Sequence, residues 1–437
     1  MRRYDTPIEV AAVLAKHAPK KMTSLLEPAV GSGVLLEPLL MRSNQFLKRV
    51  VCIDIDSNIL RQVKEKFKPL LSSKLNILHA DFLKWSLPET CRKSINFDCI
   101  IMNPPFSGRI EKWIRLNFAD EFPTLGKGYR SIPIEVAFVV RAVRLLNPNG
   151  VLLAIVPATL ISSFKTSWLR QYLMEIGAVD YVHELPKRTF KGVEARVYLF
   201  VYRKSARQRS LVVCNHDLVK PERILIKRDE LSEGIRFDYS FHYARRWYQK
   251  FKTSSPNLEW VKLNEIANVY RGRIGSPLGM RKAIHTCDYR NGFWHSGNRQ
   301  KQLLKDASDA RIQAGDLIVK RVGRHCIQSI GKVIGHEGYA CSDCLLIIRP
   351  KRKVISTVLL FTLRVLFSNN EGAQLLERGT GATYISEDDL YNLDVSIGLV
   401  KKTPKMYFNY QQAVMHKQFR YMKEIEHQIR QVYGYSL

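Results

Sequence analysis

Asn103-Pro104-Pro105-Phe106 directly follows an apolar run, Phe97 to Met102, that has the character of a buried strand. Short, continuous apolar runs are typical of parallel strands that are covered on both faces. Two successive prolines fix φ and remove two backbone N–H donors, so neither a helix nor a strand can continue through them. The sequence therefore predicts a rigid turn at the carboxyl end of a strand, which is where open α/β sheets bind their ligands.

The groups in this turn suit a flat base that carries an exocyclic amino group. The side-chain oxygen of Asn103 and the carbonyl of Pro104 can accept both hydrogens of such an NH₂ group and draw its nitrogen toward tetrahedral geometry. The nitrogen lone pair is then available to attack a methyl group, and the protein contributes positioning and electrostatics. Phe106 can stack on the base, which is worth ~1–3 kcal/mol. A plain Pro-Pro loop with Asn103 capping a turn is the alternative that these residues leave open.

Size and charge indicate a multidomain protein with a polyanionic partner. A chain of 437 residues predicts two or three domains. Its 69 Lys and Arg against 40 Asp and Glu give a net charge of +29, which suits the phosphates of a nucleic acid. A basic but otherwise ordinary surface is the alternative.

Cysteine usage and hydropathy favour a cytoplasmic protein. The eight cysteines show no framework spacing, and Cys341-x-x-Cys344 lacks a second pair at zinc spacing, so we expect reduced thiols and no metal site. The sequence shows no signal-peptide pattern and no apolar run approaching the ~18 residues of a membrane span, so neither secretion nor membrane insertion is expected.

Strands and helices alternate along the first two hundred residues or so, which predicts a doubly wound α/β domain with right-handed crossovers. Thr6, Pro7 and Glu9 have the spacing of a capping box that opens a helix. Strands are expected at 24–27, 50–54, 75–78, 97–102, 151–156, 181–184 and 195–202, and helices from 34 and at about 58–67, 133–146 and 166–176.

The alternation fades after Lys204, and the apolar runs become shorter among basic residues and glycines. We therefore expect a catalytic domain over 1–205, a linker over 206–255 and a second, mixed α+β domain over 256–437. The second domain is expected to end in one amphipathic helix near 410–432, with Phe419, Met422, Ile429 and Val432 on one stripe.

Three expected strands end in residues suited to a nucleoside. The first leads into Glu27-Pro28-Ala29-Val30-Gly31-Ser32-Gly33, whose glycines can let the backbone approach a ligand or can serve a plain packing turn. Asp54 ends the second strand and suits two ribose hydroxyls. Asp81 and Phe82 end the third, where Asp can accept from an adenine amino group and Phe can cover the ring. Either acid could instead cap a helix.

The order of these motifs resembles that of the γ class of S-adenosylmethionine-dependent amino-group DNA methyltransferases. The resemblance implies a Rossmann-like catalytic domain in which Thr6, Glu27, Gly31 and Gly33 hold the methionine part of the cofactor. It also implies that the Asn-Pro-Pro-Phe turn receives a flipped base. The implied catalytic residues are Asn103, Pro104, Pro105 and Phe106, the implied base-stacking residues are Phe106 and Phe190, and the implied cofactor-binding residues are Thr6, Glu27, Gly31, Gly33, Asp54, Ile55, Asp81, Phe82 and Asn103. Phe106 stands where the family more often has Tyr.

The second half resembles the target-recognition domains of type I restriction specificity subunits. The motifs are Arg236 to Tyr239, Leu263 to Ala267 with Arg271-Gly272, Gly315 to Ile318, and Gly379 to Thr383 before Ile385-Ser386 and Leu390. The resemblance implies a DNA-reading domain, for which the candidate DNA-binding residues are Arg271, Arg273, Lys320, Arg321 and Arg324.

These observations predict a sequence-specific DNA adenine-N6 methyltransferase that flips its target base, in a restriction–modification or related defence system. Adenine rather than cytosine rests on the resemblance. Double-stranded DNA is the expected partner, a cognate restriction endonuclease is a candidate partner, and a monomer or weak dimer is expected. The alternatives are an N-methyltransferase of RNA or of protein glutamine, and a DNA-binding specificity module without catalysis.

Overall fold

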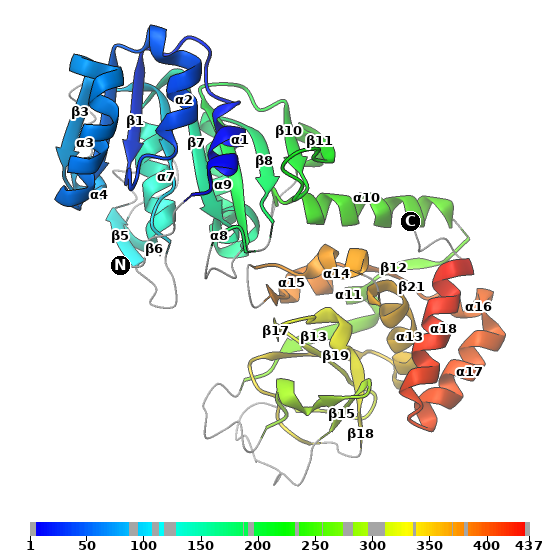
Figure 1. Ribbon diagram of the computed structural model, residues 1–437. Helices are drawn as coiled ribbons and strands as arrows, with labels where there is room; N and C mark the ends of the chain where they lie inside the picture. The colour runs from blue at the N-terminus through cyan, green and yellow to red at the C-terminus, as the bar shows by residue number, and fades with distance from the viewer. Residues whose placement is uncertain are drawn as a thin grey trace. The chain divides into compact units, whose positions relative to one another are not determined.

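The computed structural model divides the chain into two compact units, Met1–Tyr239 and Ser240–Leu437 (Figure 1). The structure describes residues 6–86, 95–106, 113–117, 128–186, 188–190, 196–231, 236–255, 257–273, 283–295, 311–334, 338–368, 370–379 and 383–432. Within these ranges, no helix combines the length and the apolar character needed to cross a bilayer.

A nine-stranded sheet forms the centre of the first unit, in the order β11-β10-β8-β9-β7-β4-β1-β2-β3. Its strands are β1 (Ser24–Pro28), β2 (Arg49–Asp54), β3 (Leu75–His79), β4 (Phe97–Met102), β7 (Leu146–Pro157), β8 (Gly177–Glu184), β9 (Val197–Lys204), β10 (Ser210–Cys214) and β11 (Arg223–Lys227). The five strands from β7 to β3 are mutually parallel. By contrast, β9 runs antiparallel to both of its neighbours.

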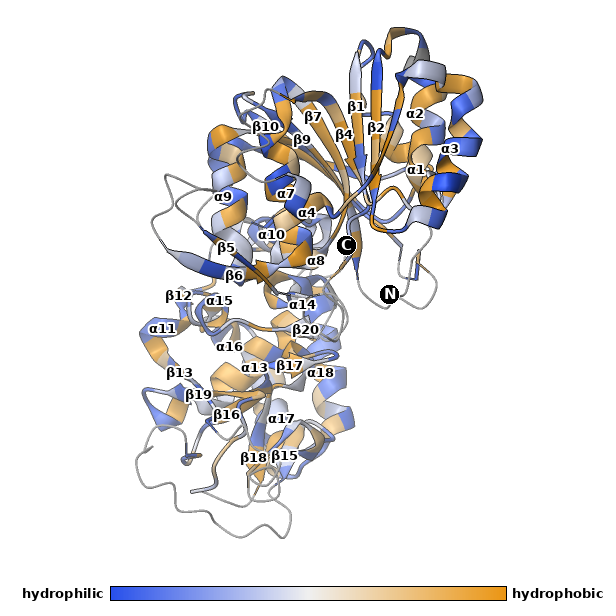
Figure 2. Ribbon diagram, turned by 90° about the vertical axis from the view of Figure 1, so that its left-hand side faces the viewer, coloured by the Kyte–Doolittle hydropathy of each residue, from blue (hydrophilic) through white to orange (hydrophobic). Residues whose placement is uncertain are grey.

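Helices cover both faces of this sheet, which makes the first unit doubly wound as expected (Figure 2). On one face lie α1 (Ile8–Ala15), α2 (Leu36–Ser43) and α3 (Ser57–Leu71), and on the other lie α7 (Ile134–Arg144), α8 (Ala158–Ser162) and α9 (Ser167–Ile176). The central strands are buried on both sides, and for this reason they are continuous apolar runs. The short helix α4 (Phe82–Trp85) packs on α7.

The chain order reverses between β1 and β4, because β1 pairs with β2 on one side and with β4 on the other. The register aligns Leu25 with Cys99 and Leu26 with Ile100, so both strands end at the same edge of the sheet. A reversal of this kind opens a crevice outside the carboxyl ends of the strands. The loop after β1 and the Asn-Pro-Pro-Phe turn after β4 therefore lie on either side of the crevice.

The boundary between the units differs from the expected linker over 206–255. Residues in that span form β10 and β11, which extend the sheet of the first unit, and α10 (Tyr239–Ser254), which begins at the boundary. The alternating burial of β11, with Arg223, Leu225 and Lys227 exposed, is typical of an edge strand. The frequent charged residues that suggested a linker are the outward-facing half of this pattern.

The second unit is mixed α+β, as expected. Its six-stranded sheet has the order β13-β19-β16-β18-β15-β14. The strands of this unit are β12 (Trp260–Lys262), β13 (Ala267–Arg271), β14 (Tyr289–Arg290), β15 (Phe293–His295), β16 (Leu317–Lys320), β17 (Val322–Gly323), β18 (Gly331–Ile334), β19 (Leu345–Pro350), β20 (Thr383–Tyr384) and β21 (Asp394–Ser396). Its helices after α10 are α11 (Leu263–Ile266), α13 (Ser356–Phe367), α14 (Asn370–Leu376), α15 (Glu387–Tyr391), α16 (Leu399–Lys402), α17 (Pro404–Met415) and α18 (Phe419–Val432).

The single terminal helix expected near 410–432 is wrong, because the segment forms two helices, α17 and α18. The chain turns at Lys417, whose φ of 57° is left-handed and incompatible with a continuing helix. On α18, Met422 and Ile429 are buried as expected, whereas Val432 is exposed.

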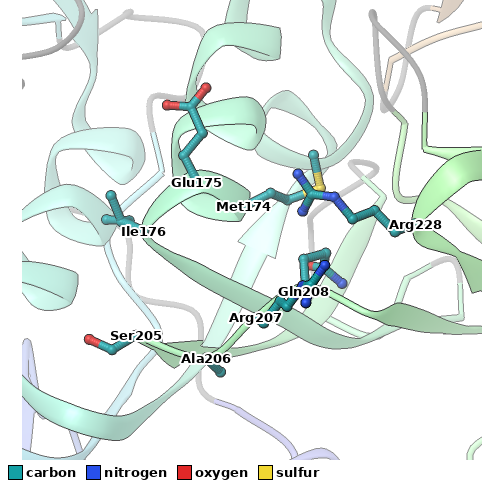
Figure 3. Close-up of a pocket in the computed structure, with 8 residues that line it drawn as sticks. All are labelled: Met174, Glu175, Ile176, Ser205, Ala206, Arg207, Gln208 and Arg228. Atoms are coloured by element: carbon teal, nitrogen blue, oxygen red, sulfur yellow. The ribbon is translucent and has the colours of Figure 1, made fainter.

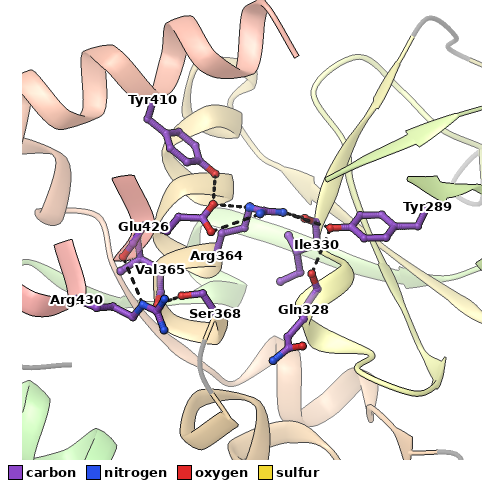
Figure 4. A network of polar contacts seen from close by, with 9 residues as sticks. All are labelled: Tyr289, Gln328, Ile330, Arg364, Val365, Ser368, Tyr410, Glu426 and Arg430. Carbon is purple, nitrogen blue, oxygen red and sulfur yellow. Dashed lines mark hydrogen bonds and ion pairs between the residues drawn. The ribbon is translucent and has the colours of Figure 1, made fainter. Parts of the chain in front are cut away.

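A buried ion pair ties the helices of the second unit to its sheet (Figure 4). Arg364 of α13 donates from Nε to Glu426 Oε1 of α18 at 2.6 Å and from Nη1 to the carbonyl of Ile330 at 3.0 Å. The Tyr410 hydroxyl of α17 donates to the same Glu426 oxygen at 3.0 Å. Burial alone would lower the pKa of Arg364, but the adjacent Glu426 carboxylate raises it above its ordinary value. The guanidinium therefore stays charged inside the core.

Replacing Arg364 by Met should destabilise the second unit by about 3–5 kcal/mol, because Glu426 would remain buried without its partner. The matched control is Lys401→Ala, which breaks the exposed Lys401–Glu259 pair and should cost less than about 1 kcal/mol. The loss of stability in each variant is measured by hydrogen exchange of the α18 amides along a urea titration. The double variant Arg364→Met, Glu426→Gln should recover part of the loss. Equal effects of the two single variants would contradict the role of the buried pair.

Candidate active site

The β1 loop carries the first group of predicted site residues. Glu27 is 1% exposed at the end of β1, and within the described residues its Oε2 has no hydrogen-bond partner. Burial, and then the nearby Asp54 carboxylate, raise the pKa of Glu27 well above its ordinary value. A raised pKa favours the neutral carboxyl, whereas a cationic amino group beside it, such as that of methionine, would favour the carboxylate and donate the hydrogen bond that Oε2 lacks within the described residues.

The two positions of this loop are glycines for different structural reasons. Both are left-handed, with φ of 52° at Gly31 and 71° at Gly33. A Cβ on Gly33 would lie 2.6 Å from Cε2 of Phe67, so this residue is small because α3 packs against it. A Cβ on Gly31 would meet nothing within 4 Å. Gly31 therefore faces open space at the crevice, whereas Gly33 serves packing.

Asp54 lies at the end of β2 in the position expected for a ribose acceptor. Its Oδ2 accepts from the N–H of Gly31 at 3.1 Å, and its Oδ1 accepts from the N–H of Asp56 at 3.0 Å. Each oxygen keeps a further lone pair for a hydroxyl. The next side chain, Ile55, is 64% exposed, although it is apolar. An apolar platform beside an oriented carboxylate fits the adenosine part of S-adenosylmethionine.

In the pair that follows β3, Asp81 takes the helix-cap alternative and Phe82 lies in a helix interface. Asp81 caps α4, with Oδ1 accepting from the N–H of Leu83 at 2.9 Å, and it is exposed. Phe82 is 2% exposed and packs on Phe138 of α7, with ring centroids 5.0 Å apart. The Phe82 ring is therefore part of the α4–α7 interface as it stands, and its covering of the adenine stays a prediction.

Thr6 does not cap α1, and the expected capping box is wrong. The N-cap is Pro7, and no side chain caps this end of the helix. The Thr6 hydroxyl instead accepts from Nδ2 of Asn103 at 3.0 Å. The bond fixes the Asn103 amide and turns its Oδ1 away from Thr6. The segment before α1 thus meets the turn after β4, although 97 positions separate the two residues.

The two predicted stacking rings differ in accessibility. Phe106 is half-buried at the end of the turn and packs against the core of the first unit. Phe190 is 3% exposed and belongs to the same core cluster. Phe106 can therefore present a ring face as it stands. The stacking of Phe190 on a base stays a prediction, since its ring is inside the core.

Two of the five candidate DNA-binding residues of the second unit share a hydrogen-bond acceptor. Arg271 and Arg321 both donate to the Asp343 carbonyl, at 3.3 and 2.7 Å. Burial, and then the Arg271 charge, lower the pKa of Arg321. The ammonium of Lys320 lies 5.6 Å from the centroid of the Tyr289 ring. Arg273 and Arg324 are both exposed.

A hollow in the first unit lies at the other edge of the sheet (Figure 3). It is lined by Met174, Glu175, Ile176, Ser205, Ala206, Arg207, Gln208 and Arg228. Because β9 runs antiparallel to β7, the carboxyl end of β9 at Lys204 lies at the amino ends of the parallel strands, on the side of the sheet away from the carboxyl ends of β1 and β4. The hollow is therefore separate from the candidate site.

Comparison with known proteins supports the resemblance seen in the motifs. Residues 39–190 match the family model of the Eco57I restriction-modification methylases, a segment that holds Asp54, Asp81 and the Asn-Pro-Pro-Phe turn but not the β1 loop. A curated relative, the type II methyltransferase M.CvrRI of Paramecium bursaria Chlorella virus XZ-6E, is 26% identical over 182 residues, which are 42% of each chain. The chain thus spans less than half the length of this relative. The matched segment is similar to restriction–modification methyltransferases, which agrees with the resemblance in motif order.

Two solved structures are similar at lower identity. A methyltransferase subunit of a type I restriction-modification system from Streptococcus thermophilus is 23% identical, with a TM-score of 0.42 over 48% of this chain and 47% of that one. The type IIG restriction endonuclease BpuSI is 14% identical, with a TM-score of 0.48 over 98% of this chain and 66% of that one.

The two glycines of the β1 loop should respond differently to alanine. Gly31→Ala should cost about 1–2 kcal/mol, from its left-handed backbone alone. Gly33→Ala should cost about 1–3 kcal/mol more, since its new methyl group meets Phe67. Thermal unfolding measures the loss of stability in each variant. Adding Phe67→Leu to Gly33→Ala should recover part of the stability lost, since the smaller side chain makes room for the methyl group. Equal losses at both glycines would contradict the packing reason for Gly33.

Proposed function

We propose that this protein transfers a methyl group from S-adenosylmethionine to the N6 amino nitrogen of an adenine in double-stranded DNA. The observation that carries the proposal is the Asn103 amide, which Thr6 holds beside the crevice between β1 and β4. The β1 loop on the other side of the same crevice offers Glu27 and the open face of Gly31. An oriented acceptor for an amino group and a fitting cofactor loop thus share one site.

The side chains of the crevice account for cofactor binding. Glu27 would accept from the cationic amino group of the methionine, Asp54 from the ribose hydroxyls, and Ile55 would pack on the adenine ring. Asp81 would accept from the adenine amino group, although its Oδ1 already caps α4. When bound, S-adenosylmethionine supplies an electron-poor methyl group on a sulfonium.

The Asn-Pro-Pro-Phe turn accounts for the chemistry on the target. The Asn103 Oδ1 and the Pro104 carbonyl accept the two amino hydrogens of the base. Their pull reduces delocalisation of the nitrogen lone pair into the ring, and that pair can then point at the methyl carbon. Phe106 stacks on the base face, and Pro105 keeps the turn rigid. The amino nitrogen forms a bond to carbon as the carbon–sulfur bond breaks, and it then loses a proton to solvent.

DNA is the substrate that the charge balance favours. A net charge of +29 suits a phosphate backbone. In this proposal Arg271 and Arg321, which share the Asp343 carbonyl, and the exposed Arg273 and Arg324 contact DNA from the second unit. A target-recognition role for that unit and a cognate restriction endonuclease as partner belong to the same proposal.

Two other functions remain distinct candidates. The same turn can hold the amide NH₂ of a protein glutamine or an amino group in RNA. A specificity module without catalysis would keep the fold but would have no need of the Thr6–Asn103 bond.

Asn103→Ala should reduce methyl transfer on the order of 10²–10³-fold, because one of two preorganised acceptors is lost. Tritiated S-adenosylmethionine should be offered in parallel to unmodified genomic DNA, RNA and protein, and labelled DNA should be digested to identify the modified base. The matched control is Asn76→Ala on edge strand β3, an exposed asparagine that should leave transfer unchanged. Label in RNA or protein alone, or normal turnover by Asn103→Ala, would refute the proposal.

Thr6→Val should slow transfer roughly two- to tenfold, because the Asn103 amide loses one hydrogen-bond partner. Thr6→Ser keeps the hydroxyl and should retain most of the activity. Calorimetric titration with S-adenosylmethionine separates the two roles of Thr6: an unchanged affinity in Thr6→Val indicates orientation of Asn103, whereas a weakened affinity indicates contact with the methionine part.

A further inference from the structure

A two-stranded hairpin, which the sequence expectations missed, follows the Asn-Pro-Pro-Phe turn. It consists of β5 (Trp113–Asn117) and β6 (Tyr129–Pro133), which pair antiparallel with Ile114 opposite Ile132 and Arg115 opposite Ser131. Residues directly opposite each other in such a pair share a face. The hairpin therefore has two chemically distinct faces. The alternation of β5 is the sequence signal that could have predicted it.

The inner face fixes the hairpin to the first unit. Leu116 and Ile132 are 7% and 4% exposed, and Ile114 is half-buried. The hairpin packs against α7, which begins directly after β6. Because these apolar side chains occupy one face, the other face is turned outward.

The outer face is aromatic and positively charged. Tyr129 is 63% exposed and Trp113 is 41% exposed. The guanidinium carbon of Arg115 lies 4.9 Å from the centroid of the Tyr129 ring, so the two side chains form one platform. Neither strand contains an acidic residue. Arg130 is exposed as well, but it lies opposite Leu116 and so does not belong to this face. Exposed rings beside arginines are the combination with which proteins hold unstacked bases and their phosphates.

The hairpin lies close to the candidate site. Trp113 follows Phe106 by seven residues, and a chain of that length spans at most about 25 Å. In Figure 1 the hairpin lies at the edge of the sheet where β1 and β3 end. A nucleic acid strand whose base reached Asn103 would therefore run within reach of the hairpin.

We propose that the outer face of the β5–β6 hairpin binds the DNA strand that carries the target base. Arg115 contacts a phosphate of this strand, and Tyr129 and Trp113 stack on bases that lose a neighbour when the target flips. Base flipping leaves unstacked faces next to the gap, and an aromatic platform compensates for this loss. The inference rests on the proposed function, since it requires DNA as the substrate.

The test compares full-length variants by the fluorescence anisotropy of a fluorescein-labelled duplex of random sequence. Tyr129→Ala should weaken binding roughly fivefold or more, while Tyr129→Phe, which keeps the ring, should bind like the wild type. Arg115→Ala should weaken binding and reduce the slope of log affinity against log salt by about 1. The matched controls are Leu225→Ala and Lys227→Ala on the exposed face of edge strand β11, which should bind like the wild type.

The outcomes separate this inference from the function on which it rests. Wild-type affinity in both Tyr129→Ala and Arg115→Ala would overturn the hairpin surface and leave DNA methylation standing. Equal losses in the β11 controls would also overturn it, since the effect would then come from charge and apolar area in general. A wild-type protein that binds S-adenosylmethionine but no duplex, or that binds only RNA, would overturn the proposed function and the hairpin surface together. Unchanged thermal unfolding of each variant excludes misfolding as the cause.

Discussion

Parallel pairing of β1 with β4 is the constraint on which the candidate site depends. The two strands are adjacent in the sheet but far apart in the chain, so their carboxyl ends bring together loops that local sequence could not join. The loop after β1 has a buried acid and an open glycine, and the turn after β4 has an amide and a carbonyl. In the proposed function the two loops are complementary, because the first would hold the methyl donor and the second the amino group that accepts the methyl. Without this pairing, each loop would be an ordinary connection.

The first unit was largely predictable from the sequence, for a definite physical reason. β4 has the expected bounds because both of its faces are buried and the two prolines end it. The edge of the same sheet was less predictable. β11 is exposed at every second residue, and its basic residues resemble those of a linker when burial is unknown.

Two other differences arise where the local sequence signal misleads or is missing. Thr6 has the spacing of a helix cap, yet its hydroxyl binds Asn103, a residue 97 positions away. The break between α17 and α18 depends on a left-handed Lys417, and neither glycine nor proline marks it. The roles of Phe82 and Phe190 depend on ring positions that spacing does not determine. Residue types and strand ends could thus be predicted, whereas the accessibility of each side chain could not.

The bond between Thr6 and Asn103 has a consequence for biogenesis. A contact that spans 97 positions is slow to form compared with the turns and helices on either side of it. During synthesis the cofactor loop after β1 leaves the ribosome well before β4. The nascent chain therefore carries the loop after β1 before Asn103 is present for Thr6 to hold. The Thr6–Asn103 contact is therefore made in a later step of folding than the local turn of the β1 loop.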